Sequence, residues 1–149
     1  MRDGAFDVKA AKFEVRPLIG DESALLHAAL DPVLHDVRVS GAIIPDIQEE
    51  AHEDVEGIVS AWLANRAGQG GMGIRVQSGL PLAEQVAGLA EQVQEWELEE
   101  LPAAGLPATW PHCPGHPNSH PLSPEARDGQ AIWACPRTGR RVAAVGGLR

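Results

Sequence analysis

Two cysteines and two histidines near the C-terminal end have the residue types and spacing of a metal site. Cys113 and His116 are three positions apart, His120 follows after four more, and Cys135 closes a segment of 23 positions. Thiolates and imidazoles are the ligands that zinc prefers, and four of them complete a closed, structural tetrahedral site. The sequence therefore predicts a structural Zn²⁺ ion held by Cys113, His116, His120 and Cys135.

The fourth ligand must come from outside the second turn, because that turn is incomplete. In a zinc ribbon each of two turns donates two ligands, but the turn that begins at Cys135 has Thr138 at the second ligand position. Threonine is a poor zinc ligand, so His120 is predicted to take this place. His112 is the weaker candidate, since a neighbour of Cys113 would have to fold back sharply. A disulfide between the cysteines, two free thiols and another metal are the alternatives.

Apolar periodicity predicts helices in the first two thirds of the chain. The strongest pattern covers 46–66, where apolar residues recur at spacings of three and four after an aspartate suited to capping. A second long helix is expected over about 81–100, with its proline in the first turn. A shorter helix is expected over 21–30, with Pro32 beyond its end.

Alternating apolar and polar residues predict strands at 12–16, 33–40 and 72–77. Near the C-terminus, 131–135 and 141–145 flank a turn and predict a hairpin. The expected fold class is α+β, or a small α/β fold. It comprises a three-stranded sheet with two long helices, plus a C-terminal zinc-ribbon-like β-hairpin module.

Proline marks a change of composition after the last predicted helix. Seven of the twelve prolines lie between positions 102 and 124, at Pro102, Pro107, Pro111, Pro114, Pro117, Pro121 and Pro124. Such a run breaks regular structure, so we expect a boundary near 102–108. The predicted units are an α/β body, 1–101, and a zinc-ribbon-like module, 102–149.

The C-terminal module also carries a wider pattern around the candidate ligands. This pattern consists of Thr109 to His116, His120 to Leu122, Asp128 and Gly129, Ile132 to Pro136, Gly139 and Val142. It resembles a module found in small uncharacterised actinobacterial proteins and covers about the last 40 residues. The resemblance implies a zinc-ribbon-like fold and implies no activity.

Charge is divided unevenly along the chain. Residues 1–100 carry 19 acidic and 7 basic residues, a net charge of −12, whereas residues 101–149 carry 2 acidic and 5 basic residues, a net charge of +3. The body should repel nucleic acid and anionic membranes and favour a basic protein partner. Arg137, Arg140 and Arg141, beside Trp133, keep a nucleic-acid-binding regulator open as an alternative.

The closed ligand set favours a non-catalytic interaction or adaptor protein over an enzyme. An alternative is a metal-dependent hydrolase, if His27, His35, Asp36 and His52 meet in space. No apolar run approaches the length of a membrane span, and the N-terminus has no hydrophobic signal segment. We therefore expect a cytoplasmic protein.

Overall fold

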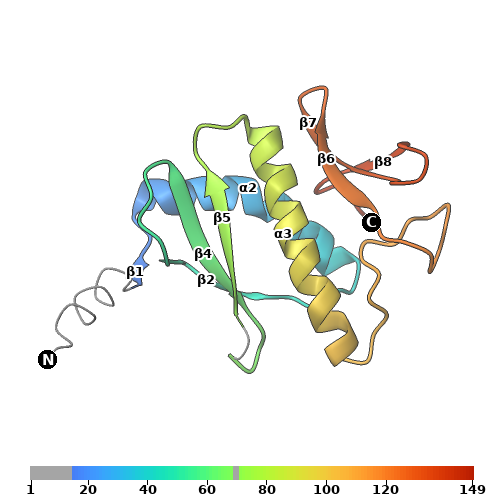
Figure 1. The fold of residues 1–149 in the computed structure, drawn as a ribbon, viewed down its shortest axis with the longest axis horizontal. Helices are drawn as coiled ribbons and strands as arrows, with labels where there is room; N and C mark the ends of the chain where they lie inside the picture. Colours follow the sequence, from blue (N-terminus) through green and yellow to red (C-terminus); the bar gives the residue numbers. More distant parts are fainter. Residues whose placement is uncertain (1–14, 69–70) are drawn as a thin grey trace, which may run out of the picture.

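The computed structural model describes residues 15–68 and 71–149. These residues form two long helices and three small antiparallel sheets, which confirms the α+β class. The helices are α2 (Gly20–Val39) and α3 (Leu82–Ala103). Figure 1 shows α3 at the centre of the molecule, between the first sheet and the C-terminal sheet.

The first sheet has the strand order β2-β4-β5, with β4 in the middle. Its strands are β2 (Asp46–Gln48), β4 (Ile58–Ala64) and β5 (Met72–Gln77). A separate two-stranded ribbon joins β1 (Arg16–Pro17) to β3 (Glu50–Ala51). Alternate residues of β4 and β5 enter the core, because side chains along a strand point to opposite faces. These core residues are Val59, Ala61, Leu63, Ile74 and Val76.

The C-terminal sheet has the order β6-β7-β8. Its strands are β6 (Ser123–Arg127), β7 (Gln130–Ala134) and β8 (Arg141–Ala144). The predicted hairpin is thus present as β7 and β8, and β6 adds a strand that the sequence did not reveal. Pro124 lies inside β6 and interrupts its pattern, which is tolerated because β6 is an edge strand.

One buried cluster runs through both parts of the chain. Trp110, Leu122 and Trp133 from the C-terminal segment belong to the same apolar cluster as the buried residues of α2 and α3. The C-terminal sheet therefore packs on the helices and shares their core.

The predicted helix over 46–66 is wrong. That segment contains β2, β3 and the central strand β4, with a turn at Gly57 (φ +82°) that a helix does not accommodate. Most of β4 is buried on both faces, so its sequence is a nearly continuous apolar run. Periodicity alone does not distinguish such a run from a buried helix.

The predicted strand at 33–40 is also wrong, because α2 continues through Pro32 to Val39. Proline removes one helical hydrogen bond but does not prevent burial of the residues on either side. Leu30, Val33 and Val37 lie on one face and are almost completely buried. Packing of this face outweighs the local cost of the proline.

The predictions at 72–77 and 81–100 are confirmed by β5 and α3. The predicted strand at 12–16 lies mostly outside the described residues. Within the described part of the chain, neither helix has the length and apolar character needed to cross a membrane.

Candidate metal centre

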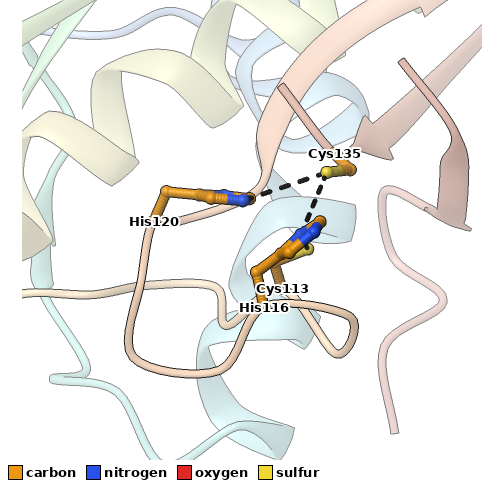
Figure 2. A group of neighbouring side chains, drawn as sticks. All are labelled: Cys113, His116, His120 and Cys135. Atoms are coloured by element: carbon orange, nitrogen blue, oxygen red, sulfur yellow. Dashed lines mark hydrogen bonds between the residues drawn. The ribbon is translucent and has the colours of Figure 1, made fainter. Parts of the chain in front are cut away.

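The four residues singled out by sequence lie together in space. Figure 2 shows Cys113, His116, His120 and Cys135 converging on one point from a loop and from the end of β7. One potential ligand atom from each residue lies within 4.8 Å of all the others. Within residues 15–68 and 71–149 this is the only group of three or more His, Cys, Asp or Glu side chains placed to share an ion.

The shortest distances agree with a tetrahedral centre. His116 Nδ1 lies 3.5 Å from Cys113 Sγ and 3.5 Å from Cys135 Sγ, and His120 Nε2 lies 3.9 Å from Cys135 Sγ. Zinc bonds of about 2.3 Å to sulfur and about 2.0 Å to nitrogen, at a tetrahedral angle, separate S from N by about 3.5 Å. The residues present therefore fit zinc.

The first turn presents its ligands through local hydrogen bonds. The His116 amide donates to the Cys113 carbonyl at 3.0 Å, and the Ser119 amide donates to the His116 carbonyl at 3.2 Å. These bonds fold the chain so that a thiol and an imidazole three residues apart face the same point. The Cys113 side chain is buried, whereas His116 is half-buried.

The second turn is closed around Cys135. The Gly139 amide donates to the Cys135 carbonyl at 2.7 Å, and Gly139 adopts the left-handed conformation that this turn requires. A hydrogen bond from the Thr138 side chain, helped by the backbone amides of Thr138 and Arg137, lowers the pKa of the Cys135 thiol to about 6. Thr138 thus stabilises the thiolate, which is the form that binds metals.

His120 is oriented by a neighbouring carbonyl. Its Nδ1 lies 3.1 Å from the Pro121 carbonyl oxygen, so this nitrogen carries the proton and Nε2 is left to bind a metal. His112 is exposed, pairs through its backbone with Pro121, and lies outside the cluster. The geometry therefore favours His120 over His112 as the fourth ligand.

The two cysteines are free thiols, and both are buried. The predicted alternative of a disulfide between Cys113 and Cys135 is not formed.

Comparisons with protein-family models, curated proteins and solved structures find no significant match.

The structure does not bring the residues of the predicted hydrolase site together. His27 contacts the carboxylates of Asp31 and Glu49 on the protein surface. His35 faces the backbone of Leu148, and the ring of His52 packs against Trp62. Each of these histidines has its own neighbours, and none belongs to a shared metal group in the described residues.

Sequence reasoning missed two supporting groups at the metal centre. Thr138 was recognised as a poor ligand but not as a hydrogen-bond donor to Cys135. The Pro121 carbonyl, which orients His120, has no side-chain signal at all. The threonine was identifiable in principle, because hydroxyl and amide donors to thiolates recur around metal ligands.

Proposed function

We propose that this protein is a non-catalytic interaction or adaptor protein whose C-terminal segment is held by a structural zinc ion. The observation that carries this proposal is the convergence of two thiols and two imidazoles within 4.8 Å. Two cysteines and two histidines supply all four positions of a tetrahedral zinc site. A catalytic zinc needs a position open to water or substrate, and this ligand set leaves none.

The ion would join two separate pieces of chain. Cys113, His116 and His120 lie in a loop without helices or strands, whereas Cys135 directly follows β7. A metal ion bound by both pieces would hold the loop against the sheet. The resemblance to a zinc-ribbon-like module supports this arrangement, and reduced thiols suit a cytoplasmic protein.

The partner surface that we propose is acidic. Asp54 and Glu56 are exposed in the loop before β4, and the first 100 residues carry a net charge of −12. Complementary charge raises the association rate and discriminates against wrong partners. A basic protein is therefore the expected partner of this face.

Ligand substitutions test the zinc centre. His120→Ala should lower zinc affinity at least about tenfold, because loss of a ligand weakens a closed site strongly. His112→Ala is the matched control, since His112 is exposed and lies outside the cluster. Elemental analysis gives the zinc content of each protein, and competition with a chromogenic chelator gives its zinc affinity. Full zinc retention in His120→Ala, with unchanged affinity, would reject the proposed ligand set.

Partner capture tests the interaction role. A partner recovered from the native host is purified. Its affinity for the wild type is compared with its affinity for the loop variant Asp54→Asn/Glu56→Gln. The control is Glu91→Gln/Glu95→Gln, which removes the same charge from exposed positions on α3. The proposal requires a basic partner that binds the wild type and the control better than the loop variant. Equal binding to all three proteins contradicts the assignment of this face.

A further inference from the structure

A cavity of about 440 Å³ adjoins the candidate metal centre. It lies between the first turn and the β8 side of the hairpin. The lining residues are Cys113, Pro114, Gly115, His116, Cys135, Thr138, Arg140, Arg141 and Val142. This volume falls in the range of small-ligand pockets and is far larger than a single metal ion needs.

Arginine determines the charge of this cavity. A zinc ion bound to two thiolates and two neutral imidazoles has no net charge, so the centre does not oppose the positive charge of Arg140 and Arg141. Arg141 Nη1 donates to Gln130 Oε1 at 2.9 Å. The guanidinium of Arg140 has no hydrogen-bond or ion-pair partner among residues 15–68 and 71–149. The cavity therefore presents the unpaired guanidinium of Arg140, whose planar donors match a carboxylate.

The cavity wall also offers groups for a peptide chain. Val142 and Pro114 supply apolar surface, and Thr138, whose hydroxyl accepts a hydrogen bond from the Arg140 amide at 3.1 Å, also lines the cavity. Arg141 and Val142 belong to β8, which is an edge strand of its sheet. Edge strands carry backbone groups that can pair with an extended peptide.

We propose that this cavity binds a short acidic segment of a partner protein, with carboxylates on Arg140 and Arg141. This inference gives the chemistry of a second partner surface for the proposed adaptor role, and it rests on that role. The molecule then has an acidic body and a basic cavity on the hairpin, which could bind two partners of opposite charge.

An acidic peptide fits this surface better than nucleic acid does. A few carboxylates meet the cavity locally. A nucleic-acid strand extends well beyond it, and its affinity grows with the number of phosphates neutralised. The body that such a strand would approach carries a net charge of −12. Within about 8–10 Å, the screening length at physiological salt, this charge repels a long polyanion.

The test is fluorescence anisotropy of a fluorescein-labelled hexaglutamate peptide with the zinc-loaded full chain. Hexaglutamine with the same label controls for the peptide backbone and dye. Arg140→Gln should weaken binding about three- to tenfold, because it removes a charge-assisted contact. Arg137→Gln is the matched control, since Arg137 is exposed and carries the same charge but does not line the cavity. It should weaken binding less than about twofold.

Three results would overturn the inference. One is the absence of saturable binding up to about 1 mM hexaglutamate. The second is equal weakening by Arg140→Gln and Arg137→Gln, which would indicate general charge attraction. The third is tighter binding of labelled oligothymidylate than of the peptide, lost in Arg140→Gln, which would assign the cavity to nucleic acid.

Zinc content measured on each protein separates this inference from the proposed zinc centre. Zinc-loaded protein that fails to bind the peptide refutes the cavity inference alone. Folded protein that takes up no added zinc but binds the peptide through Arg140 refutes the zinc centre and supports the cavity.

Discussion

The indole nitrogen of Trp133 donates a hydrogen bond to Oδ2 of Asp36 at 2.7 Å, and both side chains are fully buried. The backbone amide of Gly146 donates to the same oxygen at 2.7 Å, and that of Leu148 donates to Oδ1 at 3.1 Å. One carboxylate on α2 thus receives three donors from the C-terminal segment. This contact joins the two parts of the chain independently of any metal.

Replacement of Asp36 by asparagine should therefore destabilise the whole fold. The new side-chain amide would keep one acceptor oxygen and place an N–H₂ group against a buried donor. We expect a loss of about 2–4 kcal/mol in the free energy of unfolding, measured by urea denaturation. Asp31→Asn, an exposed change on the same helix, should stay within about 0.5 kcal/mol. Equal stability of Asp36→Asn and Asp31→Asn would show that the buried contact contributes little.

Glu97 should make stability depend on pH. Burial raises the pKa of its carboxyl to about 8, a charge on Glu100 adds to this effect, and a hydrogen bond from the Ile43 amide partly opposes it. The other oxygen of Glu97 has no partner in the described part of the chain. An unfolded glutamate releases its proton near 4.5, so between about pH 4.5 and 8 the folded state binds more protons. This contribution to stability is complete at low pH and is lost as the pH rises to about 8.

The variant Glu97→Gln cannot ionise and keeps an acceptor for the Ile43 amide. Relative to the wild type, it should gain stability between about pH 5 and 8, by at most about 1.4 kcal/mol per pH unit. The comparison uses urea midpoints of both zinc-loaded proteins, so that pH effects on metal binding cancel. Parallel pH profiles for the two proteins would mean that Glu97 ionises normally in the fold.

Gly73 leaves space for the ring of His52. A Cβ atom at position 73 would lie 2.9 Å from ring atoms of His52, and that ring packs against Trp62 with centroids 4.6 Å apart. Gly73→Ala should cost about 1–3 kcal/mol, because the ring must leave its position. Gly79→Ala is the control, since a Cβ there meets nothing within 4 Å.

A double-mutant cycle separates this clash from other effects of alanine in β5. In a His52→Ala background the cost of Gly73→Ala should shrink markedly, since the colliding ring is gone. Additive costs in the cycle would assign the effect to the strand backbone and not to the ring.

The parts of the fold with clear local signals were predicted correctly. The helix at 81–100 has a regular apolar stripe and a proline at its start, and the strand at 72–77 is bounded by glycines. The ligand cluster could be predicted for a similar reason, because Cys113, His116 and His120 lie close together in sequence. Cys135 followed from its place at the end of a predicted strand.

The errors have a common physical origin in tertiary packing. The central strand β4 is covered on both faces, so its sequence lacks the alternation that marks a half-buried strand. The continuation of α2 beyond Pro32 depends on burial of Val33 and Val37 by distant parts of the chain. The contact between Asp36 and Trp133 likewise joins residues 97 positions apart. Local sequence patterns do not reveal such distant pairs.

The most direct test of the central claim is the metal content of the untagged protein, purified without any chelator. Elemental analysis should find one zinc per chain, and removal of that zinc should lower the melting temperature and expose both thiols to a thiol reagent. Protein that is folded, contains no stoichiometric metal and takes up none when zinc is added would contradict the account.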